Sequence, residues 1–442
     1  MCNLRGHGLD IEKSFSITTL GCKLNQFESE CIRQELIRLG WECRDFGTKV
    51  SFSIINTCTV TGKTDSRCRN AVRRAKRASP ENLVVVTGCY AEVTPKALEM
   101  MSEVDFVLGN SKKASIPFEL ERLAGSKSDL AFESSPEKFL YGIDDFNKHS
   151  RAFIKVQEGC DSSCTYCIIP RARGSSRSIS RDDVIAQVVR LENNGIEEVV
   201  LTGIHIGRYG YDLPGAMKLD TLISDILSHT DKVRLRLSSI EMNEVSDGIL
   251  SLMVSSERLA SHLHIPLQSG DEDILKAMNR PYTATDFRAK IDKVKKSSMD
   301  ISIGTDIITG FPGETDSRFR NTRNFLKALP FDYFHVFAFS RRSGTPADTM
   351  NDQVSPETKK SRSRKLIRLG KKKKFEFMRS RTGKRDVVLV QRKAKRYSRF
   401  LTGLTGNYCE VSLKAPSSKY GKLCPVDITH YSRGRLYGTL SE

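Results

Sequence analysis

The stretch Gly159-Cys160-Asp161-Ser162-Ser163-Cys164-Thr165-Tyr166-Cys167 places three cysteines at C-x₃-C-x₂-C spacing. It directly follows residues 153–156, an apolar run that we predict to be the first strand of a β/α barrel. Loops at the carboxyl ends of barrel strands carry the chemistry of such folds. Three thiolates at this spacing can hold three irons of a [4Fe–4S] cluster, which leaves the fourth iron open to a small molecule.

Two other roles for these cysteines are less consistent with the sequence. A structural zinc ion needs four ligands, and the nearest following histidine is His205. A disulfide would use two of the three thiols and leave one exposed. The spacing and the barrel context therefore favour the iron–sulfur cluster.

Further apolar runs continue the barrel along the chain. Six strands separated mostly by helical patterns are expected at residues 153–156, 198–201, 233–237, 263–265, 301–308 and 333–339. Six β/α units in series predict a partial (β/α)₆ barrel over residues 151–376. The overall fold class is therefore α/β.

A second set of cysteines precedes the barrel. Residues 13–124 alternate strands and helices, which predicts a parallel α/β domain. Cys22, Cys58 and Cys89 each follow one of its first three strands. Parallel strands bring such loops to one edge of the sheet, so the three thiols can converge on a second three-thiolate site. The alternative is three small buried residues at the starts of loops.

The remaining segments are a linker and a basic C-terminal region. Residues 125–150 are polar and aperiodic, which predicts a linker, and residues 377–442 contain short strands between turn residues, which predicts a small antiparallel β-domain. Residues 359–399 hold 19 Lys and Arg against Glu376 and Asp386, within a chain of 442 residues whose net charge is +18. Such a charge run is often only a solvated face, but this concentration favours contact with nucleic acid phosphates. The expected RNA-binding residues are Lys371, Lys372, Lys373, Lys374, Arg392, Lys393, Arg396 and Tyr397.

The cysteine content also bears on the compartment. Twelve cysteines without an apolar leader in residues 1–13 argue against a secreted disulfide framework and for metal or redox chemistry. No apolar run reaches the roughly 20 residues of a spanning helix. A cytoplasmic protein without a membrane partner is expected.

Cys160, Cys164 and Cys167 resemble the signature of the radical S-adenosylmethionine (SAM) enzymes. Upstream motifs around Cys22, Cys58 and Cys89 narrow the resemblance to the methylthiotransferases, as do Ile169-Pro170-Arg171-Ala172-Arg173-Gly174 and Gly310-Phe311-Pro312-Gly313-Glu314-Thr315. The resemblance covers roughly residues 13–440, and it implies that the β-domain is a TRAM domain. Arg171 departs from the family, in which an aromatic residue is common there.

The segments 201–207 and 236–241 look most like the bacterial branch that acts on N6-threonylcarbamoyladenosine in tRNA. The resemblance implies 2-methylthiolation of that base through radical SAM chemistry. It also implies two [4Fe–4S] clusters, SAM, a low-potential electron donor of the flavodoxin or ferredoxin type and a sulfur source. Candidate SAM contacts at strand ends are Thr202, Gly203, Ser239, Glu241 and Gln268; the alternative for each is ordinary loop capping. His205 and His264 are expected to be structural.

Other functions remain open from the sequence. The same chemistry could act on isopentenyladenosine in tRNA or on an aspartate of a ribosomal protein. An iron–sulfur RNA-binding protein that senses redox state would share the cysteines without catalysis. Release of 5′-deoxyadenosine by the reduced protein separates the enzyme from the sensor.

Overall fold

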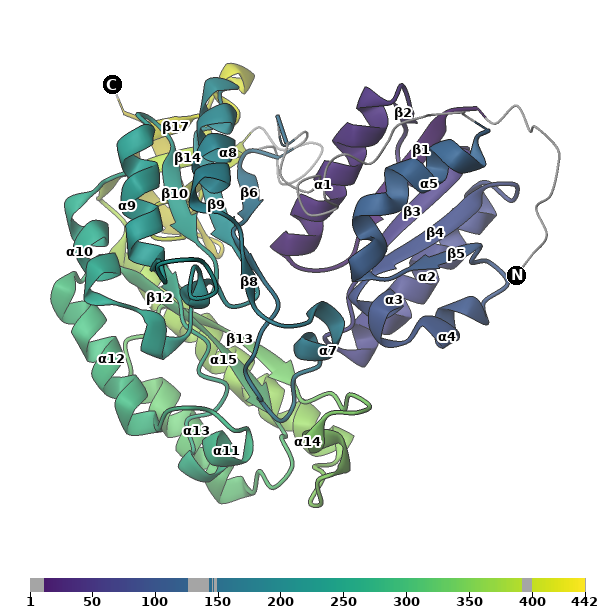
Figure 1. Ribbon diagram of the computed structural model, residues 1–442. Helices are drawn as coiled ribbons and strands as arrows, with labels where there is room; N and C mark the ends of the chain where they lie inside the picture. The colour runs from purple at the N-terminus through teal and green to yellow at the C-terminus, as the bar shows by residue number, and fades with distance from the viewer. Residues whose placement is uncertain (1–11, 126–142, 145, 147–148, 392–399, 442) are drawn as a thin grey trace. The chain divides into compact units, whose positions relative to one another are not determined.

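The computed structural model describes residues 12–125, 143–144, 146, 149–391 and 400–441, which form two compact units (Figure 1). The first unit comprises Met1–Asp144 and Ile168–Ser175. The second comprises Asp145–Cys167 and Ser176–Glu442. The eight residues that follow the cysteine motif therefore belong to the first unit, although the motif itself belongs to the second.

The first unit is a parallel five-stranded sheet in the order β2-β1-β3-β4-β5. Its strands are β1 (Ser14–Thr19), β2 (Glu42–Cys43), β3 (Phe52–Thr57), β4 (Leu83–Gly88) and β5 (Phe106–Leu108). Its helices are α1 (Lys23–Arg38), α2 (Gly62–Ala78), α3 (Cys89–Val93), α4 (Pro95–Glu99), α5 (Ile116–Leu123) and α7 (Ile169–Arg173), with the 3₁₀ turn η1 (Asn110–Ser115). The two-residue strand β2 was not expected from the sequence because it is too short to show a period.

Both faces of this sheet are covered by apolar residues. Ile54 of β3 packs into a core with Ile32 and Leu36 of α1, and Ile55 packs on the opposite face with Val72 of α2. A strand that is buried on both faces reads as a continuous apolar run, which is why β3 and β4 are visible in the sequence. Helix α1 begins directly after Cys22, which is extended and acts as its N-cap.

The second unit opens with the expected six-stranded partial barrel. Its strands are β6 (Ala152–Lys155), β9 (Glu198–Thr202), β10 (Arg234–Leu237), β11 (His262–His264), β12 (Ser302–Thr309) and β13 (Tyr333–Ala338). All their pairings are parallel, in the orders β10-β9-β6 and β11-β12-β13, and a bridge between Ser239 and His264 joins the two sets. A small antiparallel pair, β7 (Gln157–Glu158) with β8 (Arg177–Ser178), flanks the cysteine loop and was not predicted.

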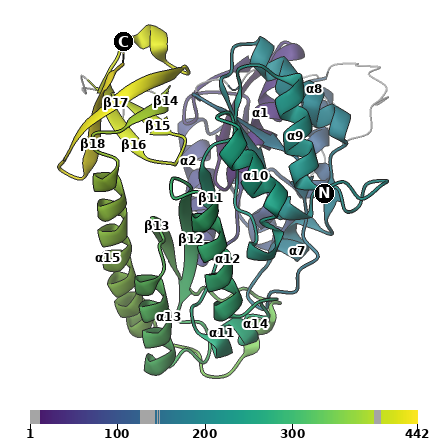
Figure 2. The same ribbon diagram turned by 90° about the vertical axis from the view of Figure 1, so that its left-hand side faces the viewer.

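Helices cover the outer face of the barrel (Figure 2). They are α8 (Arg181–Asn193), α9 (Leu219–His229), α10 (Asp247–Ser255), α12 (Ala284–Ser297), α13 (Asp316–Ala328) and α15 (Pro356–Ser380). Two shorter helices, α11 (Glu272–Ala277) and α14 (Pro346–Thr349), pack beside Tyr166 of the cysteine motif, and the 3₁₀ turns η2 (Ile206–Arg208) and η3 (Met242–Glu244) follow β9 and β10. A Cβ at Gly370 of α15 would lie 3.0 Å from the ring of Phe334, so Phe334 faces the helices. Since neighbours alternate along a strand, Tyr333 and His335 face the inside of the barrel.

The chain ends in a small closed β-barrel, which we refer to as the β-domain. Its strands are β14 (Arg385–Gln391), β15 (Leu401–Thr405), β16 (Glu410–Lys414), β17 (Leu423–Ser432) and β18 (Arg435–Leu440), closed in the order β14-β15-β16-β18-β17, with the 3₁₀ turn η4 (Ser417–Lys419) before β17. One pairing, β16 with β18, is parallel rather than antiparallel. Pro425 lies within β17 and weakens the strand pattern of that segment in the sequence. The expected domain boundary at 376/377 falls within helix α15.

Two buried arginines join the β-domain to the barrel. Arg234 donates to the carbonyl oxygens of Val387 (2.8 Å) and Leu404 (3.1 Å). Arg236 donates to those of Gly406 and Thr405, both at 2.9 Å. Both guanidinium groups also pair with Glu198 of β9, which is fully buried. The two parts of the second unit are thus held in one arrangement.

Candidate metal centres

The cysteine loop of the second unit lies beyond the carboxyl end of β6. Cys160 Sγ accepts a hydrogen bond from the backbone N–H of Ser162 at 3.4 Å and lies 3.5 Å from His205 Nδ1. His205 Nε2 lies 2.7 Å from Glu244 Oε1, and the His205 backbone N–H donates to Gln157 Oε1 at 2.7 Å. His205 was expected to be structural, but the structure places it beside a candidate ligand. The glycine turn at Gly203, two residues before His205, is the sequence feature that could have indicated a site here.

These contacts favour the thiolate form of Cys160. Burial alone raises the pKa of Cys160, but the contacts to His205 and Ser162 outweigh it, so the pKa lies below its usual value. Burial alone lowers the pKa of His205, whereas its contacts to Cys160 and Glu244 raise this pKa to about 10. A thiolate is the form that ligates iron.

A pocket of about 830 Å³ opens beside this loop. Arg280 lies on its wall, where Nη1 donates to Cys164 Sγ at 3.3 Å and Nε donates to the Tyr282 hydroxyl at 2.9 Å. The same guanidinium pairs with Glu241. Burial raises the pKa of Glu241. The pocket therefore offers both charges next to the thiols, which suits a zwitterionic ligand, and Arg280 and Glu244 are site candidates that sequence analysis did not single out.

The strand-end candidates occupy different environments. Glu241 lines the pocket. Thr202 is buried at the end of β9, and a Cβ at Gly203 would lie only 2.7 Å from Ile206, so this turn requires glycine. Ser239 is exposed beside His264. Gln268 has a φ of 70° and joins β12 through backbone hydrogen bonds. Of the five candidates, the structure places only the Glu241 side chain on the wall of this pocket.

The first unit brings its three cysteine loops to one edge of the sheet. Cys22 caps α1 after β1, Cys58 follows β3, and Cys89 opens α3 after β4. A Cβ at Gly21 would lie 3.1 Å from the Cβ of Cys58, and one at Gly88 would lie 2.3 Å from the Thr57 carbonyl oxygen. Such close approaches leave room only for glycine. Cys22 is exposed, whereas Cys58 and Cys89 are buried, and burial raises the pKa of Cys58 to about 12.

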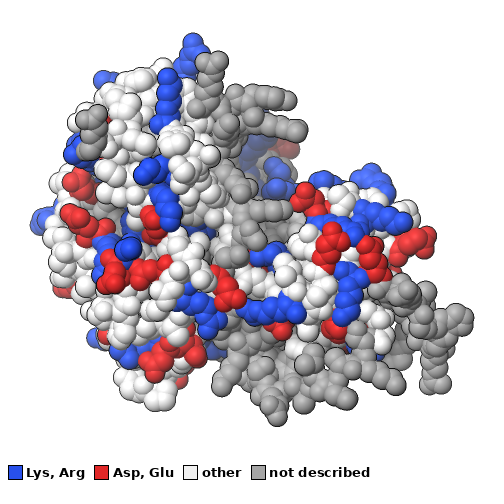
Figure 3. Space-filling view, turned by 90° about the horizontal axis from the view of Figure 1, so that it is seen from above, with Lys and Arg blue, Asp and Glu red and all other residues white. Residues whose placement is uncertain are grey.

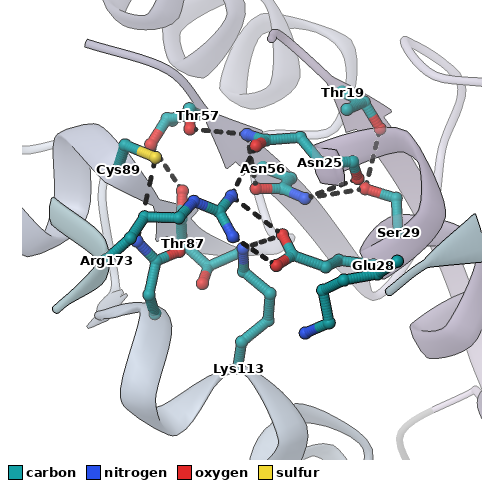
Figure 4. Close-up of polar contacts among 12 residues, drawn as sticks. Thr19, Asn25, Glu28, Ser29, Asn56, Thr57, Thr87, Cys89, Lys113 and Arg173 are labelled. Atoms are coloured by element: carbon teal, nitrogen blue, oxygen red, sulfur yellow. Dashed lines mark hydrogen bonds and ion pairs between the residues drawn. The ribbon is translucent and has the colours of Figure 1, made fainter. Parts of the chain in front are cut away.

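A buried polar network supports this edge (Figure 4). Cys22 Sγ donates to Asn25 Oδ1 at 3.4 Å, and Asn25 Nδ2 donates to the Thr57 carbonyl oxygen at 2.9 Å. Arg173, from the segment after the cysteine motif, donates to Asn25 Oδ1 at 2.7 Å and to Glu28 Oε1 at 2.5 Å. Lys113 also pairs with Glu28. Two cations therefore share one carboxylate, which leaves net positive charge where three thiolates would need it.

Neither cysteine triad has the geometry of a single-ion site. Within the described residues, only one group of three or more ligand atoms lies within 4.8 Å of one another, and it contains no cysteine (His264, Asp306 and His335). Tetrahedral zinc with Zn–S bonds of about 2.3 Å would draw its sulfurs closer together than that. The described cysteines therefore do not form a closed single-ion site.

Four of the eight expected RNA-binding residues lie within the part of the chain that the structure describes. Lys371, Lys372 and Lys374 are exposed on α15. Lys373 instead donates to the Leu329 carbonyl oxygen at 2.6 Å, and burial lowers its pKa. Arg392, Lys393, Arg396 and Tyr397 lie outside the described residues. On the face shown in Figure 3, basic and acidic side chains are interspersed.

The helices of the described residues also bear on membrane insertion. None of them combines the length and the apolar character that crossing a membrane requires.

Comparisons with known proteins agree with this architecture. Residues 154–326 match the Radical SAM superfamily, and residues 14–109 match the Uncharacterized protein family UPF0004. The chain is similar to the radical S-adenosylmethionine methyltransferase TsrM from Kitasatospora setae, with a TM-score of 0.55 and 12% identity over 76% of this chain and 74% of that one. At this identity the likeness supports the fold alone.

Curated relatives match over nearly the whole chain. The "Threonylcarbamoyladenosine tRNA methylthiotransferase MtaB" of Bacillus subtilis is 36% identical over 93% of this chain and 92% of its own length. The protein of the same name from Rickettsia prowazekii is 39% identical over 85% and 87%. The "tRNA-2-methylthio-N(6)-dimethylallyladenosine synthase" of Carboxydothermus hydrogenoformans is 32% identical over 97% and 99%. With its parallel first unit, radical SAM barrel and closing β-domain, this chain belongs to the radical SAM tRNA methylthiotransferase family.

Proposed function

We propose that this enzyme converts N6-threonylcarbamoyladenosine in tRNA to its 2-methylthio derivative. The observation that carries the proposal is the cysteine loop, with Cys160, Cys164 and Cys167 beside a pocket of mixed charge. The substrate is inferred from four relatives named for threonylcarbamoyladenosine, at 34–39% identity. Relatives named for dimethylallyladenosine are 29–32% identical.

Cys160, Cys164 and Cys167 would hold the [4Fe–4S] cluster of the radical SAM family, and Cys22, Cys58 and Cys89 would hold a second one. When bound, the clusters and SAM supply the radical cleavage of the carbon–hydrogen bond and the sulfur. The residues of the chain position these groups. Arg280 and His205 place positive charge beside the first set of thiols, and Glu241 can receive the amino group of SAM.

The second site has its own supporting groups. Asn25 fixes the loop of Cys22 against the loop of Cys58 through the Thr57 carbonyl oxygen. Arg173 and Lys113 supply net positive charge behind the three thiols. A low-potential electron donor and a sulfur source complete the proposed reaction.

Mass spectrometry of nucleosides tests this proposal. tRNA from cells with and without this chain should differ in the methylthio group of threonylcarbamoyladenosine, and the methylthio group of isopentenyladenosine should persist. Loss from isopentenyladenosine instead would assign the other tRNA substrate. No 5′-deoxyadenosine from the reduced protein would indicate an iron–sulfur sensor rather than an enzyme.

A further inference from the structure

A polar cluster on the inner face of the barrel has no part in the sites above. His264 of β11, Asp306 of β12 and His335 of β13 meet across three adjacent strands. Asp306 Oδ1 lies 3.0 Å from His264 Nε2 and 3.1 Å from His335 Nδ1. The two imidazole rings stack with their centroids 5.4 Å apart, and the Tyr333 hydroxyl lies 3.1 Å from His264 Nδ1. One carboxylate therefore orients two imidazoles.

The cluster is open to a ligand on one side. The side chain of His335 is 56% exposed and that of Asp306 is 24% exposed, whereas that of His264 is 9% exposed. Because Asp306 engages Nδ1 of His335, the Nε2 atom is the one left to meet a ligand. The contacts from both histidines outweigh burial and hold the pKa of Asp306 well below its usual value.

Two connections place this cluster next to the cysteine loop. Ile308 follows Asp306 on the same face of β12, and it packs against the same apolar cluster as Tyr166 of the cysteine motif. Two residues of a strand span about 6.5 Å. The polar cluster therefore lies about that far along β12 from the apolar residues that pack against the cysteine loop. On the other side, the carbonyl oxygen of His264 accepts from the backbone N–H of Ile240, the neighbour of Glu241.

An exposed aromatic ring completes the surface. Phe337 follows His335 on the same face of β13 and pairs in register with Ile308. It is 45% exposed, which is unusual for a phenylalanine inside a barrel. Unpaired bases stack on such rings. The inner face thus offers a flat apolar contact nearer the cysteine loop and hydrogen-bonding groups deeper in the barrel.

We propose that His335, oriented by Asp306 and stacked on His264, binds the polar substituent of the substrate adenosine through Nε2 while Phe337 stacks on its base. The proposal rests on the proposed function, because it assigns the recognised group to the threonylcarbamoyl arm. That arm carries a carboxylate, a hydroxyl and a carbamoyl group, all of which can bond to the cluster. An isopentenyl chain would bury Nε2 of His335 without a hydrogen-bond partner, which costs binding free energy.

Binding of anticodon stem–loops to the reconstituted full chain tests the inference. Three stem–loops would be used, with threonylcarbamoyladenosine, isopentenyladenosine or unmodified adenosine. His335→Leu should weaken binding of the threonylcarbamoyl stem–loop about tenfold or more, which is the effect of losing a hydrogen bond to a charged group. Its effect on the unmodified stem–loop should be far smaller. His335→Gln, which keeps a donor, should recover part of the loss, and His229→Leu, an exposed histidine at the end of α9, should change nothing.

Several outcomes would overturn the inference. Equal losses for all three stem–loops, or no loss, would show that His335 does not read the substituent. Elemental analysis that finds one divalent ion per chain besides the cluster iron in the wild type, and no such ion in His335→Leu, would make the polar cluster a metal centre instead. If the wild type itself does not prefer threonylcarbamoyladenosine, the proposed function fails; if it prefers it and His335→Leu retains that preference, only this inference fails. Iron content and melting temperature report whether each variant is folded.

Discussion

Tyr408, in the turn between β15 and β16, stacks on His262 of barrel strand β11, with ring centroids 4.4 Å apart and an interplanar angle of 16°. His262 Nε2 in turn lies 2.8 Å from the Tyr333 hydroxyl, which reaches His264 at 3.1 Å. A residue of the β-domain therefore contacts the base of the polar cluster within the barrel. The β-domain is fixed to the inner face as well as joined to α15.

Tyr408→Asn should loosen this attachment. Tyr408 has a φ of 68°, a conformation that asparagine tolerates, so the variant removes the stacking without adding backbone strain. The destabilisation should be about 1 kcal/mol or more, the value of an aromatic pair together with its buried area. Limited proteolysis and the melting temperature of the full chain measure it. Tyr431→Asn is the comparison, because Tyr431 packs against the core of the β-domain and Phe375 of α15. Cleavage between the barrel and the β-domain should increase for Tyr408→Asn; the same cleavage pattern in both variants would mean that the β-domain itself, not its docking, was weakened.

Glu198→Gln should destabilise the second unit by about 3–5 kcal/mol, because it leaves Arg234 and Arg236 buried without a counter-charge. Burial opposes ionisation of Glu198, but the two arginines hold its pKa below the ordinary 4.5. A lowered pKa contributes stability above the ordinary value and loses it as the pH falls below that value. The difference between wild type and variant should therefore be constant from pH 6 to 8. Denaturation at those pH values checks it, and a difference that grows or shrinks within this range would contradict the assignment.

Replacing either cysteine triad with alanine should remove half of about eight iron atoms, since each cubane holds four. The variant without Cys160, Cys164 and Cys167 should lose SAM cleavage. The variant without Cys22, Cys58 and Cys89 should retain some cleavage but form no methylthio product. Anaerobic reconstitution with iron analysis provides the measurement. Cys43→Ala, at an exposed cysteine on β2, should keep all the iron, and full iron in the second triple variant would refute the second cluster.

Changing Lys371, Lys372 and Lys374 to Gln should lower tRNA affinity at fixed salt. If the three lysines bind phosphates, the slope of log affinity against log salt should flatten by about 0.7–0.9 for each phosphate that the variant no longer neutralises. Lys373 is left in place because its ammonium group is bonded to the Leu329 carbonyl oxygen. Gln at Lys276, Lys293 and Lys296, exposed on α11 and α12, removes the same charge elsewhere. An equal flattening in this control would show a general charge effect without a defined surface.

The sequence predicted the elements that contain apolar residues in a run or at regular spacing. The apolar runs inside β3, β4 and β9 are examples, whereas β10 was found although Arg234 and Arg236 alternate with its leucines. The strands β2, β7 and β8 have two residues each, so no periodicity could reveal them. Contacts across long sequence distances were also invisible: no local pattern pairs Arg173 with Glu28 or Arg280 with Cys164.

The histidines illustrate the limit for sites. His205 and His264 look alike in sequence, because each lies near the end of a barrel strand. The structure separates them: His205 lies against Cys160, and His264 lies against Asp306 and Tyr333. What distinguishes the two histidines is the residue that each one contacts, and that residue comes from a part of the chain far away in sequence.

Arg173 has a consequence for the modularity of this chain. The segment Ile168–Ser175 belongs to the first unit, although residues of the second unit precede and follow it in the sequence. The chain therefore passes through the first unit twice. A fragment that stops at Asp144 would lack Arg173. Of the two cations that pair with Glu28, only Lys113 would remain. A single cut of the chain therefore cannot separate the two units without dividing the first one.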